Sequence, residues 1–450
     1  MTGKEKLMTK LEGVLAASKA DQTEIVYIGT ESGLTRYANS YIHQNVYENN
    51  SQIFFRSIVD NRIGVASTNS LVTADLKKTL ADSLEIARNQ PPNPRFPGLP
   101  RPAKYKDMRT FDEVTARFSP RDRARVVKKV IARATRKKFT MAGSFSSGCG
   151  EVAVLNSLGV RAYQPVSGAA INMIAMSDTS SGYAALAARG VEEIDFDALA
   201  QTAVEKCDTS QNPRQIDPGE YEVILEPAAI VEILDWLGYI GFGSKMYEQK
   251  MSFLSGRIGR KITSDQITFY DSGSDKLGMN FPFDFEGVPK KKVAFIDKGV
   301  VRGVVYDRMA AAKAKTKSTG HALPANWASE GALPMNVIMG PGKAKKDSMI
   351  ASVKRGILVT RFHYINGYID TKNSMLTGMT RDGTFLIENG EVVGGLKNLR
   401  FTDSMMRAFK STVAISRETE RHGLASSMVG CTVAPTVHLG SFKFTGRTEF

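Results

Sequence analysis

The proline-rich segment from Gln90 to Pro102 restricts the fold of this chain more than any other feature of its sequence. It contains six prolines, and proline lacks the backbone N–H that a helix interior or a central strand requires. We therefore expect a linker or a long surface loop here. A second break falls at Asp208 to Pro218, a polar stretch with two prolines that precedes a new apolar run.

These breaks divide the sequence into three expected parts, residues 1–103, 104–215 and 216–450. A chain of 450 residues is too long for one ordinary hydrophobic core, so more than one folding unit is expected. The first 20 residues have apolar side chains at helical spacing and are predicted to form an amphipathic helix, not a signal peptide. No apolar run is long enough to span a bilayer, so we expect no membrane association.

The first two parts resemble each other. In the first, Asn39-Ser40 precedes a β-rich run that reaches Gly64, and a helical stretch follows. In the second, Asn156-Ser157 precedes a similar run that reaches Gly182, again with a helical stretch after it. The matching positions are offset by 117 residues (39 to 156) and 118 residues (64 to 182). An internal duplication of a strand–strand–helix unit explains this offset, and chance similarity of short motifs is the alternative.

The third part is predicted to be mostly β. Asp382-Gly383 and Asn389-Gly390 are turn dipeptides, and they bracket a predicted hairpin strand over residues 384–387. Further strands are expected over 293–296, 300–306 and 357–364, and helices over 226–239 and 404–409. The predicted fold class is therefore α+β, with two similar N-terminal strand/helix units followed by a large β-rich C-terminal domain.

The net charge of +14 leaves two interpretations of the most basic stretch, residues 121–138. Val126, Val127 and Val130 lie among its cations at helical spacing, which favours a helix with a buried apolar stripe and a solvated basic face. The alternative is a patch that contacts nucleic acid or an acidic partner. No aromatic residues interleave with these charges to stack on bases, which weakens that alternative.

A series of short motifs runs through the second and third parts. They are Asn156-Ser157-Leu158-Gly159, Asp284-Phe285-Glu286-Gly287-Val288-Pro289, Ser318-Thr319-Gly320, Arg361-Phe362-His363-Tyr364, Gly378-Met379-Thr380-Arg381-Asp382-Gly383, Glu388-Asn389-Gly390 and Asn398-Leu399-Arg400-Phe401. Each is weak alone, but in this order they resemble the TldD/PmbA family from about residue 20 to the end. The resemblance implies one of two homologous subunits that enclose a peptide-cleaving chamber.

The same resemblance implies that one subunit carries zinc on a His-Glu-x-x-x-His helix and that the other, TldE-like subunit lacks it. Zinc hydrolysis needs about three protein ligands, an open position for water and a carboxylate. The five histidines of this chain lie at least 16 residues apart, and the His-Glu-x-x-x-His motif is absent. Aligned with the motif, Leu234 and Tyr239 replace the ligating histidines and Asp235 replaces the catalytic glutamate. Because leucine cannot bind zinc and tyrosine is a poor substitute for histidine, we expect zinc only in the partner subunit.

A different metal site is the remaining alternative for this chain. Cys431, His438 and His422 are its best candidates, although a buried cysteine with two unrelated histidines is the favoured interpretation. The three cysteines, Cys149, Cys207 and Cys431, are widely spaced and odd in number, which fits a reducing compartment. We therefore expect a cytoplasmic location.

Six residues are candidates for contacts with substrate or with a partner subunit: Arg361, His363, Thr380, Arg381, Asp382 and Arg400. Arg361 and His363 alternate on one predicted strand face. Thr380-Arg381-Asp382 is interpreted either as a turn with a surface ion pair or as a site where Arg381 or Thr380 contacts a peptide backbone or the partner. Met246, Tyr247, Met251, Phe253 and Leu254 are candidates for a separate apolar subunit contact, although packing in the core is the favoured interpretation of such residues.

Together these patterns predict a non-catalytic, zinc-less subunit of a TldD/TldE-type metallopeptidase complex that degrades or trims flexible peptides with a homologous catalytic partner. One alternative is a stand-alone binding or regulatory protein that contacts nucleic acid through residues 121–138. The other is an autonomous hydrolase with an unrecognised site, although no Gly-x-Ser-x-Gly nucleophile motif is present.

Overall fold

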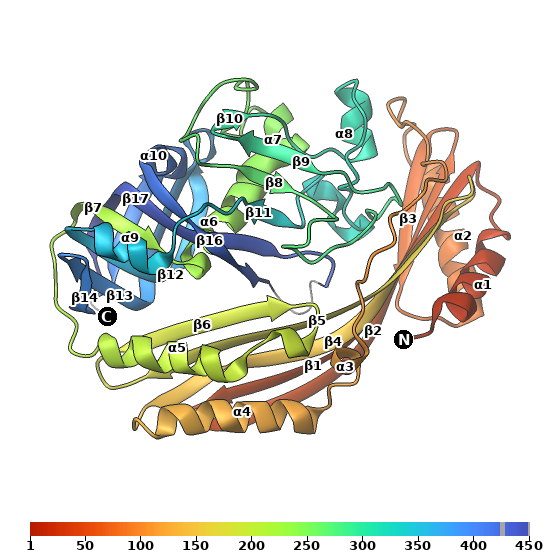
Figure 1. Ribbon diagram of the computed structural model, residues 1–450. Helices are drawn as coiled ribbons and strands as arrows, with labels where there is room; N and C mark the ends of the chain where they lie inside the picture. The colour runs from red at the N-terminus through yellow and green to blue at the C-terminus, as the bar shows by residue number, and fades with distance from the viewer. Residues whose placement is uncertain (424–427, 449–450) are drawn as a thin grey trace.

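The computed structural model describes residues 1–423 and 428–448. The chain has an N-terminal half built on a six-stranded sheet and a C-terminal half built on an eleven-stranded sheet. Figure 1 shows the C-terminal half lying over the N-terminal sheet. The predicted α+β class is confirmed. Within the part of the chain that is described, no helix is long and apolar enough to cross a membrane.

The N-terminal sheet contains both copies of the expected duplication. Its antiparallel strands follow the order β3-β2-β1-β4-β5-β6, and β1 pairs with β4 at the centre. Each copy has one helix, three strands and a closing helix. The first copy comprises α1 (Lys4–Leu15), β1 (Gln22–Ala38), β2 (Tyr41–Val59), β3 (Arg62–Thr68) and α2 (Thr73–Asn89). The second comprises α4 (Pro120–Thr135), β4 (Thr140–Asn156), β5 (Arg161–Met176), β6 (Ser181–Ala188) and α5 (Phe196–Thr209), with short turns at α3 (Glu113–Ala116) and η1 (Val191–Glu193). The two copies therefore share one continuous sheet.

Both faces of this sheet are covered. Successive strand residues point to opposite faces, so Ile25 packs with α1 and α2 while Phe145 packs with α4 and α5. The alternate residue Val26 faces the other way and packs with Phe281 and Phe283 of the C-terminal half. The same alternation that forms the helix-covered core thus attaches the C-terminal half to the sheet.

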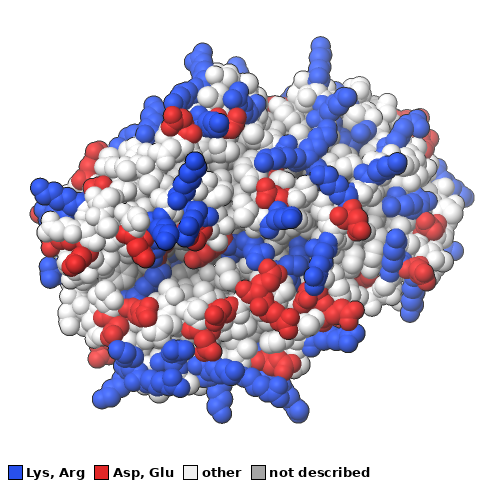
Figure 2. Space-filling view, in the orientation of Figure 1, with Lys and Arg blue, Asp and Glu red and all other residues white. Residues whose placement is uncertain are grey.

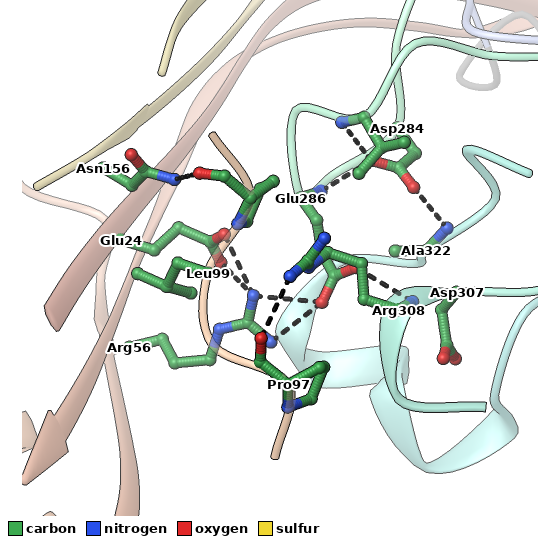
Figure 3. Close-up of polar contacts among 12 residues, drawn as sticks. Glu24, Arg56, Pro97, Leu99, Asn156, Asp284, Glu286, Asp307, Arg308 and Ala322 are labelled. Carbon is green, nitrogen blue, oxygen red and sulfur yellow. Dashed lines mark hydrogen bonds and ion pairs between the residues drawn. The ribbon is translucent and has the colours of Figure 1, made fainter. Parts of the chain in front are cut away.

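The proline-rich segment lies between the two halves (Figure 3). Arg308, at the start of α8 (Arg308–Lys313), donates a 2.9 Å hydrogen bond to the carbonyl oxygen of Gly98. Asn156 of β4 donates a 2.8 Å bond to the carbonyl oxygen of Pro100. Because the segment forms no helix or strand, its carbonyl groups have no partner in a helix or a sheet, and both halves of the molecule supply donors to them. The segment is therefore fixed at the interface.

The last strand closes part of the C-terminal sheet into a ring. β17 (Thr432–Arg447) pairs with β15 (Leu399–Ser404) and also with β7 (Gly219–Leu225). Between them, β13 (Met375–Glu388) and β12 (Arg355–Asp370) complete the circuit. A closed ring leaves its strands without open edges. The remaining elements are α6 (Pro227–Leu237), η2 (Gly238–Phe242), α7 (Ser244–Glu248), β8 (Phe269–Asp271), β9 (Val293–Asp297), β10 (Val300–Val301), η3 (Ala325–Glu330), β11 (Val337–Met339), α9 (Lys346–Ser352), η4 (Thr371–Asn373), β14 (Glu391–Gly395), α10 (Met405–Lys410) and β16 (Thr412–His422).

The expectation of a turn at Asp382-Gly383 is wrong. Strand β13 continues through these residues as a bulge, and its pairing with β12 shifts register between Val359 and Arg361. Both bulge residues have positive φ, 52° at Asp382 and 120° at Gly383. A left-handed Asx-Gly pair also occurs in bulges, which the dipeptide alone does not distinguish from hairpin turns. The second dipeptide, Asn389-Gly390, does connect β13 to β14.

Two other predicted elements are shorter than expected. The strand expected over residues 300–306 is confined to Val300–Val301. Farther along the same stretch, Val305 forms an isolated bridge with Gly243 and does not extend β10. The basic helix ends at Thr135, so the last cations of residues 121–138 lie beyond it.

Candidate functional site

Helix α6 carries Leu234 and Asp235, and the π turn η2 that follows it carries Tyr239, the third position aligned with the zinc motif. Pro227 occupies its first turn, where the missing N–H is harmless, and the helix passes into the π turn η2 at Gly238. Leu234 is fully buried in the C-terminal core. Asp235 and Tyr239 instead face a pocket of about 520 Å³. The structure therefore separates Leu234 from the other two, because residues four apart share a helix face and residues five apart do not.

The pocket is mainly apolar. Its lining residues are Asp235, Gly238, Tyr239, Phe285, Leu323, Pro324, Trp327, Leu333, Pro334, Met335, Val337, His422, Gly423, Gly430, Cys431 and Thr432. Asp235 is solvent-accessible within this concave surface and accepts a 2.5 Å hydrogen bond from the Thr432 hydroxyl. Surrounding protein raises the pKa of Asp235, while the Thr432 bond and His422 oppose that shift. The carboxyl is thus already bonded within the chain.

Tyr239 lies in an aromatic group at the pocket. Its hydroxyl donates a 2.9 Å bond to Glu330, and its ring meets Trp236 and Tyr368 edge-on at centroid distances of 6.4 and 5.9 Å. Hydrogen bonding with Tyr368 and Glu330 raises the pKa of Tyr239, so the phenol remains protonated. Trp327, also in the pocket lining, is 59% exposed. These rings give the pocket an apolar rim open to solvent.

The alternative metal candidates are only partly brought together. Cys431 and His422 both line the pocket, whereas His438 lies elsewhere in the sheet and bonds Glu222 at 2.7 Å. Burial raises the pKa of the Cys431 thiol to about 11, and a thiol must lose its proton to bind a metal. Within residues 1–423 and 428–448, no group of three or more His, Cys, Asp or Glu side chains is placed to hold a metal ion. The residues present do not fit a zinc site.

Arg361 and Asp382, both among the predicted contact residues, form one buried ion pair. The guanidinium donates two bonds, of 2.8 and 2.6 Å, to the same carboxylate oxygen. The other oxygen of Asp382 accepts a 2.7 Å bond from Ser181, the first residue of β6. Arg361 also lies 4.5 Å above the ring of Tyr183, which is on β6 together with Ser181. The pair therefore connects the ring of C-terminal strands to the edge of the N-terminal sheet.

Glu232, which sequence reasoning did not single out, completes this group. It lies on α6, one turn before Asp235, and one of its carboxylate oxygens is 3.7 Å from a guanidinium nitrogen of Arg361. Burial raises the pKa of Glu232 to about 8; Arg361 opposes the shift, and Asp235 and Asp382 add to it. One arginine thus faces two carboxyl groups, and the raised pKa leaves Glu232 largely protonated near neutral pH. A helical spacing of three from Asp235 was the signal available in the sequence.

The other predicted contact residues occupy different environments. Thr380 is fully buried and accepts a 3.0 Å bond from the backbone N–H of Leu399. Arg381 lines a polar pocket of about 650 Å³ between β13 and the start of β6. His363 is half-buried, and burial together with Arg361 and Arg381 lowers its pKa. Arg400 is exposed on β15. Of the six, Arg381 and Asp382 share this polar pocket.

The apolar contact expected around residues 246–254 is mostly internal. Phe253 and Leu254 are buried in the C-terminal core, and Met246 and Tyr247 pack against it half-buried. Only Met251 is exposed, at 40%. Phe253 and Leu254 therefore follow the favoured interpretation, core packing, and do not belong to an exposed contact surface.

Helix α4 has the buried stripe and basic outer face of the first interpretation. Val127 and Val130 are buried, and Figure 2 shows Lys and Arg along the edge of the molecule that α4 forms. Some of these cations are paired, as Arg125 is with Asp122 at 2.9 Å and Lys137 with Asp208 at 3.0 Å. The face is convex and partly neutralised.

A buried charge cluster joins the two halves near the proline-rich segment (Figure 3). Arg56 of β2 contacts Glu24 of β1 at 2.8 Å and Glu286 of the C-terminal half at 3.1 Å. Burial raises the pKa of Glu24 to about 7, with Arg56 opposing and Glu286 adding to the shift. Asp284 accepts backbone bonds from Glu286, Val288 and Ala322, and burial beside Glu286 raises its pKa to about 7. One cation again serves two carboxyl groups.

Family models match almost the whole chain. The PmbA/TldA metallopeptidase C-terminal domain matches residues 218–446, domain 1 matches residues 23–87 and the central domain matches residues 69–208. The chain belongs to the PmbA/TldD metallopeptidase family. The family resemblance predicted from the motifs is confirmed, and Asp284, Arg361 and Asp382 from those motifs occupy the two charge groups described above.

Relatives within the PmbA/TldD family match either nearly the whole chain or part of it. The metalloprotease PmbA of Escherichia coli O157:H7 is 23% identical over 437 residues, which are 92% of this chain and 91% of that protein. A TldD homolog described as a metalloprotease from Haemophilus influenzae is 26% identical over 40% of this chain and 37% of its own length. The crystal structure of TldE from Thermococcus kodakarensis is 22% identical with a TM-score of 0.88, covering 97% of this chain and all of that chain. This last likeness establishes a shared fold.

Proposed function

We propose that this chain is the zinc-less subunit of a TldD/TldE-type metallopeptidase and acts in the cytoplasm with a homologous, zinc-bearing subunit on flexible peptides. The observation that carries the proposal is the set of side chains at the three motif positions on α6 and η2. Leu234 packs in the core, and Asp235 and Tyr239 are bonded to Thr432 and Glu330. Such a set supplies no imidazole, whereas zinc peptidases use three ligands and an open position.

The pocket beside α6 supports a role in holding peptide. Its lining combines proline, leucine and aromatic side chains with a few polar groups, the usual composition of a site for small apolar groups. Trp327 lines the pocket and is 59% exposed, and Tyr368, which packs against the lining residue Tyr239, is 54% exposed. Aromatic side chains bind apolar peptide groups with little loss of conformational entropy. In this proposal the pocket holds an apolar peptide side chain while the partner subunit supplies the reactive zinc.

The test is co-purification with a family member that carries His-Glu-x-x-x-His. We expect a zinc-free chain alone, a complex with the homologue by native mass spectrometry, zinc bound to the homologue, and cleavage of an unstructured peptide only by the complex. A homologue with its motif histidines replaced by alanine is the matched control, and it should assemble without cleaving. Chelation should abolish cleavage and added zinc should restore it.

Other outcomes would contradict the proposal. Cleavage by the isolated chain that survives chelation would establish an autonomous hydrolase. Failure to bind the homologue, together with salt-sensitive binding of RNA or DNA that is lost when the outer cations of α4 are neutralised, would favour the stand-alone binding protein.

A further inference from the structure

A second concave site lies on the C-terminal half, away from the residues considered above. It is a pocket of about 380 Å³ between the loop of residues 254–262 and helix α10. Its lining residues are Arg257, Arg260, Lys261, Ile262, Asn373, Ser404, Met406, Arg407 and Lys410. Five of these side chains are cationic, and the lining includes no carboxylate among the described residues. The lining residues Ile262 and Met406 are buried.

Two of the five cations are paired with carboxylates outside the pocket. Arg407 donates to Asp403 through two nitrogens, one bond being 2.8 Å, and Lys261 lies 3.9 Å from Asp265. Across the described part of the chain, the side chains of Arg257, Arg260 and Lys410 form no ion pair or hydrogen bond with another residue. Three uncompensated positive charges therefore surround one small concave surface, where they repel one another until an anion binds.

The backbone that carries the arginines is held in place. Gly256 and Gly259 have φ values of 70° and 79°, which a residue with a side chain rarely adopts. The N–H of Gly259 donates to the carbonyl of Val301 at 2.9 Å, and the N–H of Val301 donates back to the carbonyl of Arg260 at 3.0 Å. The loop is thus tied to β10, and Figure 1 shows β10 and α10 on the same side of the molecule. A fixed backbone lowers the entropy lost when the side chains bind a ligand.

We propose that this pocket binds the phosphate group of a small molecule. Guanidinium groups match phosphate oxygens with paired hydrogen bonds, and Arg257 and Arg260 provide two such groups. Lys410 adds a point charge, and the side chains of Ser404 and Asn373 are neutral polar groups at the same surface. Three free positive charges suit a dianionic or trianionic ligand, and the volume is at the small end of the range for ligand pockets.

The proposal is tested by isothermal titration of the full chain with inorganic pyrophosphate, with a phosphate monoester and with a single-stranded RNA, all at constant ionic strength. We expect one saturable site per chain for pyrophosphate or the monoester, and the tighter of the two identifies the source of the phosphate. The variant Arg257→Gln, Arg260→Gln, Lys410→Gln should weaken this binding at least tenfold.

The matched control removes three unpaired cations from the convex face of α4, with Arg121→Gln, Lys128→Gln and Lys129→Gln. It carries the same net charge as the pocket variant and should bind pyrophosphate like the unaltered chain. Thermal unfolding checks that both variants are folded. Equal losses in both variants, no saturable binding of either phosphate compound, or RNA binding that is tighter than both and depends on the pocket residues would overturn the small-molecule site.

Discussion

Arg361 and Asp382 face each other across a β-bulge, and two nitrogens of the arginine donate to a single oxygen of the aspartate at 2.8 and 2.6 Å. The bulge places Asp382 and Gly383 at positive φ and shifts the register of β12 against β13. Bulges redirect side chains in this way. As a result the second oxygen of Asp382 is free to accept the hydroxyl of Ser181 from the N-terminal sheet.

Replacement of Asp382 by asparagine should destabilise the chain by about 2 to 4 kcal/mol, because it leaves the buried guanidinium of Arg361 without its charged partner. Burial lowers the pKa of Arg361, but the neighbouring negative charge, chiefly that of Asp382, raises it, and the net shift of the arginine pKa is upward. Urea unfolding at pH 7 measures the loss. The matched control is Asp297→Asn, which removes an exposed pair with Arg302 and should change stability by about 0.5 kcal/mol or less. Equal effects would contradict a special role for the buried pair.

The elements of the fold were largely predictable because they depend on local patterns. The duplicated units followed from short motifs repeated at a nearly constant offset, and the turn at Asn389-Gly390 followed from residue types with strong backbone preferences. Prolines likewise identified the segment that forms no helix or strand. The dipeptide Asp382-Gly383 was misread because the same positive-φ preference serves both a turn and a bulge, and only pairing with β12 decides between them.

The candidate site was less predictable because its contacts join residues far apart in sequence. Arg361 and Asp382 were both singled out in the sequence, but their pairing depends on the bulge. Their neighbours Glu232 and Tyr183 lie on α6 and on β6 of the N-terminal sheet, far from both in sequence. The cluster of Glu24, Arg56 and Glu286 could not be inferred at all, since nothing in the local pattern of either half indicates the interface between them.

Zinc binding should be easier to create at positions 235 and 239, which both face the pocket, than at positions 234 and 239, which align with the two ligating histidines of the motif. Asp235 and Tyr239 both line the pocket that contains Cys431 and His422, whereas Leu234 is fully buried in the core. The double variant Asp235→His, Tyr239→His should therefore bind zinc more tightly than Leu234→His, Tyr239→His, as measured by metal analysis after dialysis. Leu234→His should also lower stability by about 2 to 5 kcal/mol, because it places a polar ring in the core.

Two results would revise this placement. Stoichiometric zinc in the Leu234 variant would mean that η2 rearranges to bring positions 234 and 239 onto one face. Zinc in neither variant would indicate that the surrounding residues do not orient imidazole ligands.

Stability should decrease as pH rises through neutrality because of the interface cluster. The pKa of Glu24 is raised from 4.5 to about 7 in the folded protein, so the folded state holds this proton more tightly than the unfolded chain. The stabilisation is complete below pH 4.5 and is lost as pH rises through 7, with a difference of about 3 kcal/mol. Asp284, whose pKa is also raised to about 7, acts in the same direction.

Urea unfolding between pH 5 and 8.5 measures this dependence. Glu24→Gln keeps an oxygen acceptor for Arg56 but cannot titrate, so its unfolding free energy should vary less with pH over this range. An unchanged pH profile in Glu24→Gln would show that Glu24 titrates normally in the folded chain.

Glu226 should control stability on the acid side. This residue precedes α6 and is paired with Lys206 of α5 at 2.5 Å and with Lys346 of α9, and all three lie at the junction of the two halves. Burial alone would raise the Glu226 pKa, but the two lysines lower it to about 2. Its stabilisation is therefore present above pH 4.5 and is lost as pH falls toward 2. Glu226→Gln should cost about 2 to 4 kcal/mol at pH 7 and should reduce the loss of stability between pH 4.5 and 2.5.

Asp208→Asn, which removes an exposed partner of Lys137, is the matched control and should leave the acid-side profile unchanged. A Glu226 variant as stable as the unaltered chain at pH 7 would mean that the two lysines find solvent or other partners when the carboxylate is removed.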